Sequence, residues 1–343
     1  MPQRLSTLDI DTWQQQLRDS LTSGPELLKR LRLEPQDVGF SADACRDFAL
    51  RVPLAFVERM EAGNPEDPLL MQVLATRKEL INTPGYSTDP VGESGTINPN
   101  PGVIHKYQGR VLLIVSGGCA VNCRYCFRRH FPYEENQNSR QQWQRTLDYI
   151  ARDQSITEVI LSGGDPLVAS DSMLAELVGK ISQFSQVKRL RIHTRLPVVI
   201  PDRVTSSLLD AVTSSRLKTV VVIHCNHSNE IDASLVNAIA HLRSRDITVL
   251  NQSVLLSGIN DSADALVELS EGLFGAGVLP YYLHVLDKVQ GAAHFDMPAQ
   301  DALRLHREIT ARLPGYLVPR LVSEISGEPA KTLLGSTCLD QTS

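Results

Sequence analysis

An alternation of short β-rich runs with helical stretches over the last two thirds of the chain constrains the fold most. Seven runs have the length and apolar content of buried strands, at residues 111–116, 158–162, 189–193, 219–224, 247–255, 279–285 and 316–322. Amphipathic stretches, such as residues 172–184 and 234–245, lie between most of them. Strands that alternate with helices form βαβ units and a parallel sheet. Six units and a last strand predict an α/β barrel, complete or partial, more than an open doubly wound sheet.

The residues before this alternation differ from it. The first part of the chain favours helices, with apolar residues at helical spacing from Leu8 to Leu21 and an N-cap candidate at Ser41. Prolines and glycines then interrupt the pattern, which is typical of a crossing loop or linker. We therefore expect an N-terminal helical region over residues 1–80, a crossing loop over 81–106, the barrel over 107–335 and a tail over 336–343.

Reactive and polar side chains directly follow the predicted strands. In a (β/α) barrel, active residues lie at this carboxyl face. The sequence therefore predicts one site at this rim. In chain order the candidates are Cys119, Cys123 and Cys126, Gly163, Gly164 and Asp165, Thr194 and Arg195, His224, Asn226 and His227, Gln252 and Ser253, Asp287 and Lys288, and Glu324 and Lys331.

The three cysteines after the first strand are spaced C-x3-C-x2-C. Soft thiolates on one short loop can converge on a metal centre. With no fourth cysteine nearby, they would leave one iron of a [4Fe–4S] cluster open to a small molecule. Three alternatives stand beside this interpretation. They are structural zinc with His130 as a fourth ligand, an electron-carrying cluster, which usually has four cysteines, and unligated core thiols.

Charge and composition argue against several classes of protein. A net charge of −5 without a long basic run argues against a nucleic-acid surface. The first residues lead into a polar amphipathic segment, and no stretch approaches the about 18 apolar residues of a membrane span. Six cysteines, three of them clustered, fit a reducing compartment, so we expect a cytoplasmic protein. Cys45, Cys225 and Cys338 are expected to be small buried residues.

The Gly163-Gly164-Asp165 turn after the second strand is a second motif to consider together with the cysteines. Two glycines let a ligand approach the backbone closely, although alone this motif is a common turn. Together, the triad and the turn resemble the radical S-adenosylmethionine superfamily. The resemblance implies a partial (β/α)6 barrel whose cysteines hold the cluster and whose Gly163, Gly164 and Asp165 line the methionine end of S-adenosylmethionine. Cleavage of that cofactor would release a 5′-deoxyadenosyl radical.

Further segments resemble the lysine 2,3-aminomutase family, in order from about residue 80 to about 335. They are residues 105–113, 126–131, 161–167, 224–230, 251–256 and 280–287. The resemblance implies pyridoxal phosphate bound as a Schiff base to Lys331, with Lys106, Tyr107 and Arg110 near its phosphate and ring. Gly-Glu-Pro-Ala precedes Lys331 where the family has a glycine-rich run. Without the family context, a lysine or arginine at such positions is an ordinary surface charge.

The same resemblance implies roles around the substrate. Arg128 would bind the amino-acid carboxylate, which suits a planar bidentate donor. Asp287 and Glu324 would bind the ε-ammonium of lysine, and Glu324 replaces the usual aspartate. His224 and Gln252 would lie around the adenosyl group, and His284 stands where the family has tyrosine. Salt-bridge partners for the carboxylates and a core histidine for His224 are the structural alternatives.

The resemblance implies an isomerase that converts (S)-α-lysine to (R)-β-lysine by moving the amino group from C2 to C3. The chain lacks a long C-terminal extension with further cysteines, and resembles the short bacterial branch that supplies β-lysine for modification of elongation factor P. L-lysine is thus the expected partner, with a functional link to elongation factor P and its lysyl-transferring enzyme and with a homo-oligomer left open. The alternatives are another amino acid such as arginine or glutamate, a radical activase or methylating enzyme without pyridoxal phosphate, and a zinc-binding adaptor.

Overall fold

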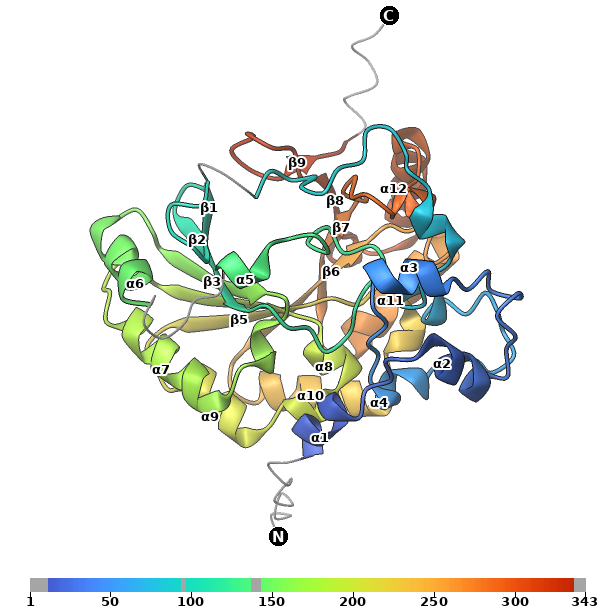
Figure 1. Ribbon diagram of the computed structural model, residues 1–343. Coiled ribbons are helices and arrows are strands. Elements are labelled where there is room, and N and C mark those ends of the chain that lie inside the picture. Colours follow the sequence, from blue (N-terminus) through green and yellow to red (C-terminus); the bar gives the residue numbers. More distant parts are fainter. Residues whose placement is uncertain (1–11, 94–96, 137–142, 336–343) are drawn as a thin grey trace, which may run out of the picture.

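The computed structural model describes residues 12–93, 97–136 and 143–335 (Figure 1). Its centre is a curved nine-stranded sheet whose strands follow one another in sequence order. Strands β2 to β8 are parallel, while β1 and β9 pair antiparallel at the two edges. The strands are β1 (Val103–Tyr107), β2 (Arg110–Ser116), β3 (Glu158–Gly163), β4 (Arg189–Thr194), β5 (Lys218–Ile223), β6 (Thr248–Val254), β7 (Leu279–His284), β8 (Arg320–Ser323) and β9 (Thr332–Leu333).

Helices connect the parallel strands and cover the outer side of the sheet (Figure 1). Each of the six β-to-β connections from β2 to β8 contains at least one of them. The α-helices are α1 (Thr12–Arg18), α2 (Gly24–Leu31), α3 (Ala42–Asp47), α4 (Leu54–Val57), α5 (Tyr133–Asn136), α6 (Trp143–Arg152), α7 (Asp171–Ser182), α8 (Leu196–Val199), α9 (Ser206–Thr213), α10 (Ala233–Arg243), α11 (Ala263–Gly275) and α12 (Ala299–Arg312). The short 3-10 helices are η1 (Leu70–Gln72), η2 (Arg77–Leu80), η3 (Pro166–Val168), η4 (Pro201–Arg203), η5 (Ser228–Glu230), η6 (Ala293–Phe295) and η7 (Gly315–Leu317).

Helix α7 illustrates why these segments fold as they do. The hydroxyl of Ser170 accepts a hydrogen bond from the backbone of Met173 and caps the N-terminus of the helix. Leu174, Leu177, Val178 and Ile181 follow at helical spacing and are buried against the sheet. They belong to one apolar cluster that also includes the inner strands and much of the N-terminal region. The barrel and the residues before it therefore share a core.

The predicted α/β fold with a partial barrel is confirmed. Within the described residues, the edge strands β1 and β9 do not pair with each other, so the barrel stays open. All seven predicted strands are present, but β8 begins only at Arg320 because η7 occupies the residues before it. Strand β1 was not predicted. It lies in the proline- and glycine-rich segment and pairs with β2 through a turn in which Gly109 has a φ of 77°.

The described part of the N-terminal region forms short helices that pack against one side of the barrel (Figure 1). Arg59 anchors it through hydrogen bonds of 2.5 Å from its guanidinium to the carbonyl oxygens of Glu230 and Val198. Helix α1 covers part of the expected segment from Leu8 to Leu21, whose first residues lie outside the described ones. The expected tail over 336–343, with Cys338, also lies outside them.

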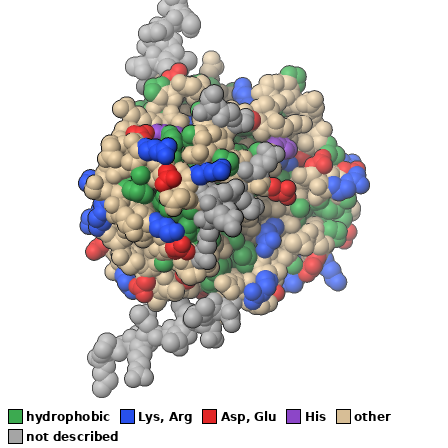
Figure 2. Space-filling view, turned by 60° about the vertical axis from the view of Figure 1, so that its left-hand side comes forward, with side chains coloured by type: hydrophobic (Ala, Val, Ile, Leu, Met, Phe, Trp, Pro, Cys, Tyr) green, Lys and Arg blue, Asp and Glu red, His purple; other side chains and the backbone are tan. Residues whose placement is uncertain are grey.

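The surface is mixed in charge on the face shown in Figure 2. Lysine and arginine side chains alternate there with aspartate and glutamate, and no stripe of one sign crosses this face. A search of the described helices finds no segment with the length and apolarity of a membrane span.

Candidate functional site

A cavity of about 930 Å³ lies inside the barrel and reaches the carboxyl ends of its parallel strands. Its lining comes from both edges of the sheet, from the loop after β2 and from the segment after β8. All fifteen residues predicted from the sequence to bind cofactors or substrate line it. They are Lys106, Tyr107, Arg110, Cys119, Cys123, Cys126, Arg128, Gly163, Gly164, Asp165, His224, Gln252, Asp287, Glu324 and Lys331.

The cysteine loop between β2 and α5 is fastened to the N-terminal region. The backbone N–H of Asn122 donates to the carbonyl of Arg51 at 3.0 Å, and that of Arg124 donates to the carbonyl of Gln72 at 2.9 Å. The Asn122 side chain also donates to the carbonyl of Ala49. These bonds fix the loop that carries Cys119, Cys123 and Cys126.

The three thiols face the cavity without converging on one point. Burial raises the pKa of Cys119 well above its usual value, and burial with the neighbouring Cys123 raises that of Cys126 to about 11. A metal that bound these thiols would therefore have to displace their protons. No three His, Cys, Asp or Glu side chains among the described residues are close enough to hold a single metal ion.

The glycine turn at the end of β3 packs against the start of the cysteine loop. The N–H of Gly164 donates to Ser116 at 2.7 Å, and the N–H of Asp165 donates to Gly118 at 2.8 Å. Gly163 has a φ of 127°, which favours glycine. A Cβ atom on Gly164 would collide with the carbonyl oxygen of Gly118. The glycines thus bring the turn close to the residues that precede Cys119.

The carboxylate of Asp165 joins the ends of β3 and β4. It accepts hydrogen bonds from the hydroxyl of Thr194 and from the backbone N–H groups of Leu167, Arg195 and Leu196, at 2.7 to 3.0 Å. The residue is only 4% exposed. Asp165 borders the cavity, but these bonds engage its oxygen atoms within the protein. We therefore assign its side chain to positioning the rim.

Replacing Gly164 with alanine is expected to destabilise the fold by about 1–3 kcal/mol, because the methyl group overpacks the contact with Gly118. The displaced cysteine loop should also lower the iron and sulfide content of anaerobically reconstituted protein severalfold. Gly179→Ala is the matched control, since Gly179 lies in α7 with no heavy atom near the added Cβ. That change should stabilise the helix slightly and leave iron loading unchanged. Equal iron loading in both variants would refute the packing argument.

Charged groups from β1 and from the segment after β8 form a paired network in the same cavity. Glu324 accepts hydrogen bonds from Lys331 at 2.5 Å and from Lys106 at 2.8 Å. Although burial opposes it, these two ammonium groups hold the pKa of Glu324 well below its usual value. Burial, reinforced by Glu324, raises the pKa of Asp287 to about 7. Asp287 and Glu324, the two carboxylates predicted to bind the ammonium group, therefore influence each other's charge. Asp287 binds its proton more tightly than Glu324 does.

Arg128 already holds a carboxylate within the protein. Its Nε and Nη2 donate to the two oxygens of Glu93 at 2.6 and 2.8 Å, and its Nη1 donates to Ser162 at 2.9 Å. Glu93 was not predicted as a site residue, because it lies in the segment expected to be a crossing loop. Glu93 binds Arg128 through both carboxylate oxygens, and a substrate carboxylate would bind the same guanidinium in the same way.

Histidine rings line the inner wall of the cavity. Burial lowers the pKa of His224 to about 3, so its imidazole is neutral and can share a hydrogen bond with Gln252 at 3.1 Å. His193, inside a predicted strand and therefore not singled out, lies beside it with ring centroids 6.0 Å apart. The Nε2 atoms of His193 and His284 are buried and have no hydrogen-bond partner in the described part of the chain. The wall thus offers unpaired polar atoms to a bound molecule.

The aromatic and basic residues near β1 form one edge of the cavity. The guanidinium of Arg110 lies 4.6 Å from the ring centroid of Tyr107. Burial and Glu324 raise the pKa of Tyr107, so its phenol stays protonated. Lys106, Tyr107 and Arg110 therefore present two cations and a phenol to the same space as Lys331.

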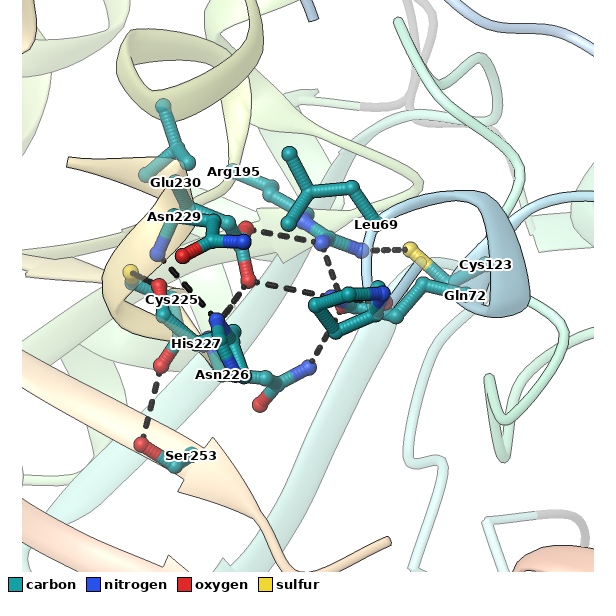
Figure 3. Close-up of polar contacts among 12 residues, drawn as sticks. Leu69, Gln72, Cys123, Arg195, Cys225, Asn226, His227, Asn229, Glu230 and Ser253 are labelled. Carbon is teal, nitrogen blue, oxygen red and sulfur yellow. Dashed lines mark hydrogen bonds and ion pairs between the residues drawn. The ribbon is translucent and has the colours of Figure 1, made fainter. Parts of the chain in front are cut away.

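A buried polar cluster links β4, β5 and the N-terminal region behind the cysteine loop (Figure 3). Its centre is Arg195, which the sequence places at a strand end without a defined role. The guanidinium donates to Cys123, Gln72 and Glu230. Sequence periodicity could not have predicted this contact between residues so distant in the chain.

Comparisons with known proteins agree with this geometry. The model of the Radical SAM superfamily matches residues 113–269. L-lysine 2,3-aminomutase of Escherichia coli (strain K12) is 50% identical over 331 residues, which cover 96% of each chain. The enzyme of the same name from Haemophilus influenzae is 48% identical over 97% of this chain and 98% of its own. That from Clostridium subterminale is 30% identical over 96% of this chain and 79% of its own.

These relatives imply a [4Fe–4S] cluster, S-adenosylmethionine and pyridoxal phosphate as cofactors, and an isomerase as the class of enzyme. The cavity fits this set, because it combines three thiols, unpaired imidazole nitrogens and a lysine beside further cations. The identity to the first two relatives extends over nearly the whole chain. The chain therefore belongs to the lysine 2,3-aminomutase family of radical SAM enzymes.

Proposed function

We propose that the protein is a pyridoxal phosphate-dependent L-lysine 2,3-aminomutase that converts (S)-α-lysine to (R)-β-lysine. The observation that carries the proposal is the single cavity that joins the cysteine loop to Lys331 and to the carboxylates Asp287 and Glu324. A cluster site, a cofactor lysine and a cation-binding pair in one cavity suit a radical reaction on a basic amino acid.

In this proposal each cofactor has its own residues. Cys119, Cys123 and Cys126 hold the cluster. The backbone of Gly163 and Gly164, with His224 and Gln252, borders the S-adenosylmethionine site. Lys331 holds pyridoxal phosphate, with Arg110, Tyr107 and Lys106 toward its phosphate and ring. When bound, these groups supply the 5′-deoxyadenosyl radical and a carrier for the migrating amino group.

The protein's own residues orient the substrate between these cofactors. Arg128 binds the carboxylate through its planar fork, which requires Glu93 to yield at least one of its two hydrogen bonds. Asp287 and Glu324 bind the ε-ammonium at the far end. Arg128 thus binds one end of the substrate and the two carboxylates bind the other. This separation selects a long basic amino acid and determines which substrate hydrogen atom faces the radical source.

Anaerobic turnover tests this assignment. Reconstituted protein is incubated with L-lysine, S-adenosylmethionine, pyridoxal phosphate and dithionite, and β-lysine is measured by chiral chromatography with mass detection. We expect (R)-β-lysine, with no product when pyridoxal phosphate is removed. Parallel reactions contain L-arginine or L-glutamate. Turnover of one of these without β-lysine would overturn the substrate, and cleavage of S-adenosylmethionine that needs no pyridoxal phosphate would favour an activase or methylating enzyme.

We further propose that the β-lysine serves modification of elongation factor P. The support is the resemblance to the short bacterial branch, with 50% identity to the Escherichia coli relative against 30% to the Clostridium subterminale one. The test combines the aminomutase reaction with elongation factor P and its lysyl-transferring enzyme from the same cell. Intact-mass measurement should show more complete modification when the aminomutase is active. Equal modification with unreacted L-lysine would refute this link.

A further inference from the structure

Arg195 uses its guanidinium to connect a carboxylate with a cysteine sulfur (Figure 3). Its Nη1 lies 2.7 Å from the Sγ of Cys123 and 2.6 Å from the phenol of Tyr125. Its Nη2 donates to Gln72 at 2.7 Å and to Glu230 at 2.9 Å. An arginine has five N–H groups in a fixed fork, so only the one on Nε is left without a partner among the described residues. The partners of Nη1 and Nη2 therefore fix the orientation of the guanidinium group.

The surroundings of Arg195 are dry and rigid. Its side chain is 7% exposed and that of Glu230 is fully buried. The ring of Phe56 lies 5.4 Å from the guanidinium carbon and covers it. In such an interior a charge-assisted hydrogen bond is stronger than at the surface. The contact with Cys123 is therefore built into the fold rather than made by a mobile surface chain.

The acceptors of this arginine are held from three parts of the chain. Gln72, in η1, accepts through Oε1 and donates its own amide to Glu230 at 3.2 Å. Tyr125, inside the cysteine loop, donates to Gln72 and accepts from Asn226. Glu230 also accepts from the backbone N–H of Asn226 at 2.8 Å. The N-terminal region thus contributes a polar group directly behind the cysteine loop.

We propose that Arg195 is a positioning residue that donates a hydrogen bond to the cluster-bound sulfur of Cys123 and thereby raises the reduction potential of the cluster. The inference rests on the proposed role of Cys123 as a cluster ligand. In the relevant step the oxidised [4Fe–4S] cluster takes one electron from a low-potential one-electron donor, and no bond to Arg195 breaks. The added negative charge spreads onto the sulfur atoms. N–H groups that point at sulfur stabilise the reduced form more than the oxidised form.

The chemistry of the residue explains why an arginine is suited to this position. A lysine ammonium carries three donors on a flexible chain and could not satisfy Cys123, Tyr125, Gln72 and Glu230 together. Arginine also keeps its charge at any pH at which the enzyme is folded. Glu230 balances that charge, so the effect on the cluster depends on the direction of the N–H group as well as on charge.

The test is a redox titration of reconstituted protein followed by electron paramagnetic resonance, without S-adenosylmethionine or lysine. Iron and sulfide are assayed in every sample. For Arg195→Lys and Arg195→Gln we expect a lower midpoint potential, seen as a smaller reduced fraction at one fixed dithionite potential. The matched control is Arg203→Lys. Arg203 is also buried, donates to the carbonyls of Leu167 and Ala169, and has no thiol partner within the described ranges, so its replacement should leave the potential unchanged.

One further variant keeps the proposal testable if the Arg195 variants fail to hold a cluster. Glu230→Gln removes the balancing charge and should raise the potential. Unchanged potentials in fully loaded Arg195 variants would overturn the inference, as would no rise in Glu230→Gln. Failure of wild-type protein to bind iron and sulfide would instead overturn the cluster assignment of the proposed function.

Discussion

Replacing Lys331 with alanine is expected to remove the absorbance band of covalently bound pyridoxal phosphate and to reduce β-lysine formation below detection. The reason is that, in the proposed function, Lys331 supplies the amine that holds the cofactor, in a cavity where Lys106 and Arg110 supply further positive charge. Absorbance spectra of protein reconstituted with pyridoxal phosphate measure the first effect, and chromatography of the products measures the second. Cluster content should stay at the wild-type level, because the polar contact of Lys331 in the described residues is with Glu324 and not with a cysteine.

Lys106→Ala is the matched control for this prediction. Lys106 also contacts Glu324, at 2.8 Å, and lines the same cavity. Removing it takes away one ammonium group while leaving the amine of Lys331 in place, so the covalent absorbance band should persist. A band that survives in Lys331→Ala but disappears in Lys106→Ala would show that Lys106, and not Lys331, holds the cofactor. Our proposal would then be wrong.

The second large effect concerns Asp287, and we expect Asp287→Asn to lower kcat/KM for lysine by about 100-fold or more. The substitution leaves the ε-ammonium of the substrate without one of its two carboxylates in a buried site, and breaking a buried ion pair costs about 3–5 kcal/mol. Steady-state kinetics with L-lysine measure the loss. Asp210→Asn, at an exposed surface pair with Arg245, should leave kcat/KM unchanged. Wild-type kinetics in Asp287→Asn would exclude a role for Asp287 in substrate binding.

The same substitution should stabilise the protein in the absence of pyridoxal phosphate. The folded-state pKa of Asp287 is raised to about 7, above the ordinary value near 4 of an unfolded chain. A raised carboxyl pKa contributes stability that is complete below about pH 4 and is lost as the pH rises to about 7. Asp287→Asn, which cannot ionise, should therefore have a free energy of unfolding that exceeds that of wild type at pH 8 by on the order of a few kcal/mol, and it should unfold at a higher temperature. The difference should vanish toward pH 4.

Thermal unfolding at several pH values, with Asp210→Asn as the surface control, measures this. A stability gap that does not change between pH 5 and pH 8 would contradict the raised pKa. A gain in stability together with a loss of kcat/KM would show that the buried Asp287 carboxylate serves substrate binding and lowers the stability of the folded protein.

The sequence predicted those parts of the structure that depend on local patterns. Alternating apolar runs located the parallel strands, and the position of a residue after its strand brought Cys119 and Lys331 to one cavity although 212 positions separate them. Motifs that combine several residues at fixed spacing were equally informative. Strand β9 was missed because two residues carry too little pattern to distinguish a strand from a loop.

Contacts that depend on the packed chain could not be predicted in this way. Glu93 lies in a segment whose prolines and glycines conceal any strand or helix pattern, and its pairing with Arg128 is decided by tertiary structure. Gln72 and Arg195 meet across 123 positions for the same reason. Asp165 and Gly164 lie at the rim of the cavity, where the sequence placed them. Their contacts hold neighbouring backbone in place, and their roles at the S-adenosylmethionine site stay predictions.

The bonds from Arg51 and Gln72 to the cysteine loop have a consequence for the assembly of the enzyme. Each of these bonds needs the backbone of the N-terminal region in place, so we expect the loop to reach its folded shape after, or together with, the docking of those helices. Without that layer, the segment that carries the three thiols would lack these bonds. We therefore expect iron and sulfide to load most completely onto chains whose N-terminal region has docked.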